Sequence, residues 1–199
     1  MITALDPKAA LILIDLQNGI ASLPLFKPAK DVIEKSSIMV KAFHERGLPV
    51  IFINVNPFKD THKILRATER GLPATKEAIE QTLATMRANR FFDIVPELAL
   101  QEHDLRITKG NWNAFFNTDL HEKLQETGTT QIVLAGIATS IGVEGTARAA
   151  NELGYNIAFA KDAMSDFTET AHQHSLNVIF PRIGEVDDAH IIVEKLKAV

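Results

Sequence analysis

Cysteine is absent from the 199 residues of this chain. Its absence excludes a disulfide framework, a thiolate nucleophile and any metal site with cysteine ligands. Clustered positive charge is also missing, because the 21 lysine and arginine residues are scattered and the formal net charge is -4. Proteins that bind a phosphate backbone carry a basic patch, so we expect no nucleic-acid partner.

Long apolar runs are missing as well. No run approaches the roughly 20 residues that a membrane-spanning helix needs. Residues 1–6 lack the basic and then apolar pattern of a signal peptide. We therefore expect a cytoplasmic protein with no membrane partner. The length and a hydrophobic content of 46% suit one domain over residues 1–199.

Short apolar runs of strand length do recur along the chain. They lie at 9–14, 50–55, 105–107, 132–135 and 157–160, and a sixth short strand is expected at 183–186. The intervening segments are long enough for helices, and such alternation is typical of a parallel sheet. We therefore predict a doubly wound α/β fold of about six mostly parallel strands, with helices on both faces in a three-layer arrangement.

The first long helix is expected to begin after Pro28 and to end at Gly47. Further helices are predicted at 75–89, 118–126, 141–153, 168–180 and 187–196. Segment 57–90 is unusually polar, so we expect a peripheral excursion there. It could cover the active site, form a subunit contact, or be a solvated helix and loop.

Two charged residues follow apolar runs where strands are expected to end. Ligands of open parallel α/β sheets bind beyond the carboxyl ends of the strands, which favours Asp15 and Lys109 as functional residues. Partial burial of Asp15 would raise its pKa and suit proton transfer, whereas the alternative is a structural acid that caps the next turn. Lys109 could orient that carboxylate and stabilise negative charge, or be an ordinary surface lysine.

The glycine-bounded turn 136–142 lies between a predicted strand and a predicted helix. Backbone N–H groups there, near Ala138 and Thr139, could bind a substrate anion or an oxyanion. The alternative is a tight packing turn that needs small residues. Asn54 and Asn56 end another strand and could hydrogen-bond a polar substrate.

Three segments together resemble the isochorismatase-like hydrolases. They are residues 9–17, the segment KGNWNAFFNTDL that begins at Lys109, and the segment GIATSIGVEGTAR that begins at Gly136. In cysteine-bearing members of that family the catalytic set is an aspartate, a lysine and a cysteine, and the matching positions here are Asp15, Lys109 and Gly142. Isochorismatases proper cleave a vinyl ether without a cysteine and often carry glycine at this nucleophile position.

The resemblance implies further properties. It implies the same doubly wound architecture, a homo-oligomer, and a cis peptide bond between Ala138 and Thr139. Among the aromatic residues after Lys109, which are more typical of packing, Phe115 is the one that we assign to the substrate pocket.

Neither a metal ion nor another cofactor is expected. The seven histidines are dispersed, and His172 and His174, two residues apart, would diverge on a helix and face solvent. Nicotinamidase-type relatives carry an Asp-x-His metal motif after the second strand, where this chain has Asn54, Val55 and Asn56. That difference weakens both the metal interpretation and the nicotinamide interpretation.

The sequence thus predicts a hydrolase that acts on a small polar metabolite, a vinyl ether or an amide, through an Asp/Lys pair and without a cysteine nucleophile. The alternative is a catalytically inactive homologue that serves as a small-molecule-binding protein or a scaffold.

Overall fold

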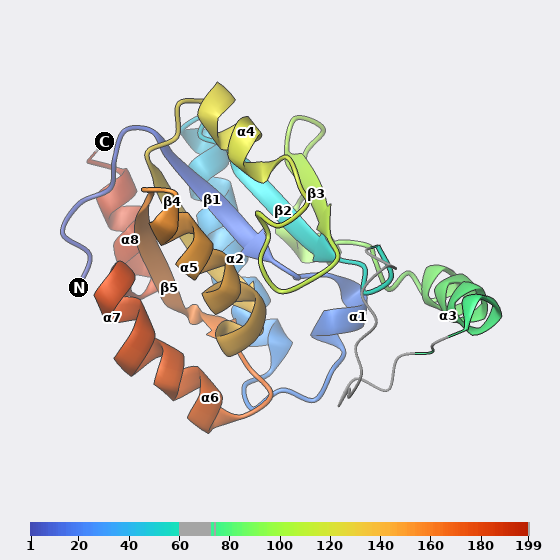
Figure 1. Cartoon of the computed structure of the whole chain (residues 1–199). Coiled ribbons are helices and arrows are strands. Elements are labelled where there is room, and N and C mark those ends of the chain that lie inside the picture. Colours follow the sequence, from blue (N-terminus) through green and yellow to red (C-terminus); the bar gives the residue numbers. More distant parts are fainter. Residues whose placement is uncertain (60–72, 74, 199) are drawn as a thin grey trace.

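A central parallel sheet organises the protein, whose computed structural model describes residues 1–59, 73 and 75–198 (Figure 1). The strand order is β3-β2-β1-β4-β5-β6, and every neighbouring pair is parallel. The strands are β1 (Ala9–Ile14), β2 (Val50–Val55), β3 (Leu105–Lys109), β4 (Gln131–Ile137), β5 (Asn156–Ser165) and β6 (Glu185–Asp187). This order is that of a doubly wound dinucleotide-binding sheet, so the predicted fold class is confirmed.

Helices follow the strands on both faces of the sheet. The α-helices are α1 (Asn18–Ala21), α2 (Ala29–Glu45), α3 (Lys76–Ala88), α4 (Leu120–Glu126), α5 (Glu144–Glu152), α6 (Glu169–His174), α7 (Phe180–Ile183) and α8 (Ala189–Leu196). A 3-10 turn η1 (Pro96–Leu98) and two π-helical turns, η2 (Thr139–Val143) and η3 (Ser175–Ile179), complete the set. Among the described residues, none of these helices is both long enough and apolar enough to cross a membrane.

Two hydrophobic clusters fill the space between the three layers. Side chains of α2 and α8 pack on one face of the sheet, and side chains of α4, α5 and α7 pack on the other. Along β1, Leu11 and Leu13 belong to the first cluster, whereas Ile12 and Ile14 belong to the second. Because successive strand residues face opposite sides, a strand buried on both faces must be apolar throughout, as β1 is.

The strand order reverses between β1 and β4. The chain moves outward from β1 to β2 and β3, and then crosses back to place β4 on the other side of β1. At the carboxyl end of this pair the backbones are very close, because a Cβ atom on Gly136 would lie 2.1 Å from the Ile14 carbonyl oxygen. Gly136 also has a φ of 125°. Only glycine is compatible with that contact and that φ, and the reversal point is where such folds bind ligands.

Several boundaries differ from the sequence-based expectations. The helix predicted at 141–153 starts earlier, as the π-helical turn η2, and the helix predicted at 168–180 is divided into α6, η3 and α7. The predicted strand 157–160 is part of a ten-residue strand, β5. Periodicity does not distinguish α from π turns, and charged residues inside β5 conceal its length.

The polar segment 57–90 contains α3, close to the predicted helix. Thr75 begins this helix by accepting a hydrogen bond from the Ala78 N–H at 3.2 Å. No residue of α3 is buried, and the helix projects away from the sheet (Figure 1). Residues 60–72 and 74 of the predicted excursion lie outside the described residues. A role for this segment at the active site or in a subunit contact stays a prediction.

Candidate active site

An aspartate and a lysine meet at the carboxyl edge of the sheet. Asp15 directly follows β1, and Lys109 is the last residue of β3. The Lys109 ammonium donates a hydrogen bond to Asp15 Oδ2 over 2.7 Å, and a second one to the Asn111 carbonyl oxygen over 3.0 Å. Only 2% of the Lys109 side chain and 8% of the Asp15 side chain are exposed. The two predicted catalytic residues therefore form a buried ion pair.

The surroundings of the second oxygen of the Asp15 carboxylate favour a chemical role for this residue. Asp15 Oδ1 is buried and has no hydrogen-bond partner among the described residues. Burial raises the pKa of Asp15 from 3.8 to about 6, and the charge and hydrogen bond of Lys109 limit the rise. The backbone at Asp15 has a φ of 53°, a conformation that is uncommon outside glycine and is found at functional sites. A carboxyl group with this pKa can both donate and accept a proton near neutral pH.

Gly142 lies directly beside this ion pair. A Cβ atom on Gly142 would lie 3.3 Å from Asp15 Oδ2 and 3.5 Å from Lys109 Nζ. The structure thus brings together the three positions that the sequence matched to the catalytic set. The φ of Gly142 is outside the left-handed region, so its backbone conformation is open to other residues. The available space restricts the residue type at position 142 more than the backbone conformation does, because the same Cβ would lie 2.8 Å from Ile14 Cγ2.

The turn that carries Gly142 already uses several of its N–H groups. Ser140 N–H donates to Asp166 Oδ2 over 2.6 Å, and the Ile141 and Val143 N–H groups both donate to the Ala138 carbonyl oxygen over 3.2 Å. A substrate oxyanion would compete with these bonds at those three positions. The cis peptide bond precedes Ala138 and joins it to Ile137, one residue earlier than predicted. The resemblance located the turn correctly but misplaced this bond by one position.

Thr139 is held by a buried histidine. Its hydroxyl donates to the Ser165 carbonyl oxygen over 3.0 Å, and its oxygen lies 2.8 Å from His172 Nδ1. Since the only hydroxyl proton is directed at Ser165, His172 must carry its proton on Nδ1 and donate it to Thr139. Burial lowers the pKa of His172. The expectation that His172 faces solvent is therefore wrong, whereas His174 is exposed.

Asn54, a predicted substrate residue, points to the other side of the sheet from the ion pair, whereas the backbone N–H of Asn56 donates to the Lys109 carbonyl oxygen over 2.9 Å. Asn54 faces the same side of the sheet as Phe52, in the first core cluster, whereas Lys109 faces the side of Ile107, in the second. Asn54 Oδ1 accepts a hydrogen bond from the Thr108 hydroxyl over 3.0 Å.

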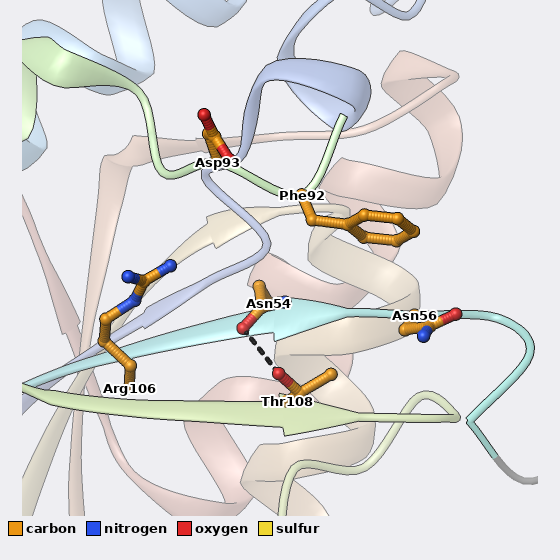
Figure 2. A pocket seen from close by; sticks show the side chains of 6 residues that line it. All are labelled: Asn54, Asn56, Phe92, Asp93, Arg106 and Thr108. Carbon is orange, nitrogen blue, oxygen red and sulfur yellow. Dashed lines mark hydrogen bonds between the residues drawn. The ribbon is translucent and has the colours of Figure 1, made fainter. Parts of the chain in front are cut away.

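Both asparagines instead line a cavity of about 420 Å3 at the edge of the sheet. Figure 2 shows Arg106 and Thr108 of β3 on one side of this cavity and the Phe92–Asp93 segment across from them. A role for the asparagines in substrate binding stays a prediction, as does that of Phe115. The Phe115 ring stacks on Tyr155 at 6.0 Å between centroids and packs against the second core cluster.

Sequence reasoning missed Asp166, which accepts hydrogen bonds from the Ser140 N–H and from its neighbour Phe167 N–H. Asp166 directly follows β5, just as Asp15 follows β1. A charged residue directly after a strand is a candidate functional residue, so a predicted strand that ended at Ser165 would have indicated Asp166 as well as Asp15. In the sequence, Lys161 and Asp162 interrupt the apolar run of that strand.

Comparison with known proteins identifies the family of this chain. Residues 9–190 match the isochorismatase domain family. The isochorismatase family protein YwoC of Bacillus subtilis is 38% identical over 190 residues, which cover 96% of this chain and 95% of that protein. A solved structure of an isochorismatase family protein from Burkholderia thailandensis is 36% identical, covers 98% of both chains and gives a TM-score of 0.83. The ureidoacrylate amidohydrolase RutB of Variovorax paradoxus is 26% identical over 204 residues, covering 90% of this chain and 79% of that protein. With the three matched positions brought together on this sheet, the chain belongs to the isochorismatase family.

Proposed function

We propose that this protein is a hydrolase of a small polar metabolite that uses Asp15 and Lys109 and no cysteine nucleophile. The observation that carries the proposal is the buried carboxylate: one oxygen is held by Lys109, and the other is free of partners among the described residues. A buried ion pair is costly to maintain, so a site with a purely structural role would gain little from it. An unpartnered oxygen at a ligand-binding edge is suited to exchange a proton with a substrate.

For a vinyl ether, the protonated Asp15 carboxyl donates its proton to the terminal carbon of the double bond. The electron pair of the double bond forms the new C–H bond and leaves an oxocarbenium ion, which water attacks at carbon. The added water returns a proton to Asp15. The resulting hemiketal then breaks its C–O bond while its hydroxyl proton passes to the departing oxygen, which gives a carbonyl compound and an alcohol. In this route Lys109 holds the carboxyl group in place and stabilises the carboxylate that forms.

For an amide, Asp15 acts first as a base. The carboxylate takes a proton from water while the water oxygen attacks the carbonyl carbon, and Lys109 stabilises the negative charge that develops. Asp15 then returns the proton to the departing nitrogen as the C–N bond breaks. The relationship to an amidohydrolase supports this route, whereas the lack of a thiol supports the first.

The two routes require opposite protonation states of one group, which gives a sharp test. The purified protein is incubated with isochorismate, with nicotinamide and with ureidoacrylate between pH 5 and pH 8, and products are measured by chromatography. Because the pKa of Asp15 is about 6, vinyl ether cleavage is expected to slow as the pH rises through this value. Amide hydrolysis is expected to accelerate over the same range. Asp15→Asn should abolish either reaction, and the exposed Asp119→Asn serves as the matched control.

The absence of a thiol also favours one competing function, a small-molecule-binding protein or scaffold that has lost its nucleophile. Binding of one of these compounds without turnover at any pH would support that alternative and overturn the hydrolase. Equal turnover by the wild-type protein and a correctly folded Asp15→Asn variant would instead remove Asp15 from the mechanism.

A homo-oligomer is part of the same proposal. Several large apolar side chains are exposed, including Trp112, Phe116 and Phe167, and side chains of this kind are suited to a subunit contact. Sedimentation of the purified protein at micromolar concentration tests this assignment.

A further inference from the structure

Two histidines and an aspartate meet at the edge of the sheet opposite to the candidate active site. His44 lies in the last turn of α2, which ends just before the amino end of β2. His103 and Asp104 directly precede β3. Each residue offers one potential ligand atom, and these atoms all lie within 4.8 Å of one another. Asp15, Lys109 and Gly142 lie at the carboxyl ends of the strands, so the two groups are at opposite edges.

The hydrogen bonds of the cluster leave its ligand atoms facing one another. His44 Nε2 lies 2.7 Å from Asp104 Oδ1. The other oxygen, Asp104 Oδ2, accepts the Gln101 N–H over 2.7 Å, which fixes the orientation of the carboxylate. The His103 ring contacts the His44 ring edge to face, with centroids 5.5 Å apart. Metal ligands are commonly oriented in this way by a bond to their outer atom.

Burial differs across the cluster in a way that suits a cation. The Asp104 side chain is 1% exposed and the His44 side chain 10% exposed, whereas His103 is open to solvent. Two ligands are therefore already positioned, and the third can close over an ion that enters from solvent. Bonds of about 2.0–2.2 Å to zinc place tetrahedral ligand atoms roughly 3.5 Å apart, so rotation of the exposed His103 is the main adjustment.

We propose that His44, His103 and Asp104 form a binding site for a divalent transition-metal ion, for which zinc is the appropriate probe. Two imidazoles and one carboxylate suit zinc, nickel or copper better than calcium or magnesium, which prefer oxygen ligands alone. The bound ion joins the end of α2 to the start of β3, and water completes its coordination. This site is independent of the proposed reaction, because it lies at the amino edge of the sheet.

The test measures zinc binding to the full chain after removal of any affinity tag. Isothermal titration calorimetry is expected to show one zinc ion per chain for the wild-type protein. The melting temperature should rise by roughly 5–10 °C when free zinc is about 100 times the dissociation constant, because the ion binds the folded state. His103→Ala removes an exposed ligand with little effect on folding and is expected to weaken binding at least about tenfold.

His190→Ala is the matched control, because His190 is also exposed but lies outside the cluster. It should bind zinc like the wild-type protein. His44→Gln gives a second test from the partly buried side and should also weaken binding. The proposal is overturned if the wild-type protein shows no saturable binding, if His103→Ala binds as tightly as wild type, or if His190→Ala loses as much affinity as His103→Ala.

Discussion

Asp15→Asn tests whether burial or Lys109 controls the protonation of the central carboxyl group. In the folded protein, burial raises the pKa of Asp15 from 3.8 to about 6, and Lys109 lowers it by less. In the unfolded chain the group keeps its ordinary pKa. This difference corresponds to about 3 kcal/mol, because a tenfold change in an ionisation equilibrium is worth about 1.4 kcal/mol. Asparagine has nearly the same volume and cannot ionise.

The sign of the effect follows from the order in which the two states lose the proton. Below pH 3.8 the carboxyl group is protonated in both states. As the pH rises from 3.8 to about 6, the unfolded chain ionises first, so the wild-type protein loses stability over this interval. The asparagine variant does not lose this stability. Loss of the carboxylate leaves the buried Lys109 ammonium without its ion-pair partner, which adds a destabilising cost of its own. The test therefore uses the change with pH of the difference between the two proteins, and not its absolute value.

The assay is urea unfolding followed by circular dichroism at several pH values from 4 to 7.5. The free energy of unfolding of Asp15→Asn, minus that of the wild-type protein, is expected to increase by roughly 2–3 kcal/mol over this range. The exposed Asp119→Asn is the control and should show a much smaller change. A difference that stays constant as the pH rises would mean that Lys109 balances burial, and one that falls would mean that Lys109 outweighs it; either result would refute the reasoning.

Three further predictions concern the neighbouring groups. In Gly142→Cys, the thiol would lie beside the Lys109 ammonium, which lowers the pKa of a thiol. The pKa measured from the rate of iodoacetamide labelling should therefore be about one or more pH units below that of the surface control Lys197→Cys. An equal or higher value would contradict the assignment of Gly142. His172→Ala leaves the Thr139 oxygen without its donor and should lose about 1–3 kcal/mol of stability in urea, whereas His172→Asn, which keeps a donor near the Nδ1 position, should lose less. Hydrolytic activity should survive exhaustive chelation, because the metal cluster proposed above is remote from Asp15; loss of activity that zinc restores would show the opposite.

Much of the fold and the centre of the site can be predicted from this sequence, for one physical reason. A strand buried on both faces must be apolar along its whole length, so its end is visible where a charged residue follows. Asp15 after β1 is identified in this way. Lys109 ends the edge strand β3, which is only partly buried and includes Arg106 and Thr108, so its identification depends more on the family pattern of the segment that it begins. Parallel strands bring their carboxyl ends to one edge, so residues 94 positions apart in sequence were expected to meet, and they do.

The parts that sequence reasoning missed depend on contacts that leave no local pattern. His172 is buried because its ring packs against Phe26 at 4.9 Å between centroids and donates to Thr139. Both partners are distant in the sequence, and a polar helix residue without such contacts would face solvent. Asp166 was missed for a related reason. Asp162, inside β5, accepts the Ala189 N–H at the start of α8, so a charged residue in mid-strand is bonded to the start of a helix that is distant in sequence.

Gly142 shows how the structure changes the meaning of a residue that the sequence presents as a missing nucleophile. If a cysteine had simply been lost, the space for its side chain would remain open beside the ion pair. Instead, Ile14 Cγ2 would lie 2.8 Å from a Cβ atom on Gly142, so a side chain of β1 fills part of that space. Packing in this chain is therefore adapted to glycine, while the ion pair beside it is kept. A buried acid and a buried cation beside a core that is packed around glycine therefore support the proposed proton transfer with water over thiol chemistry.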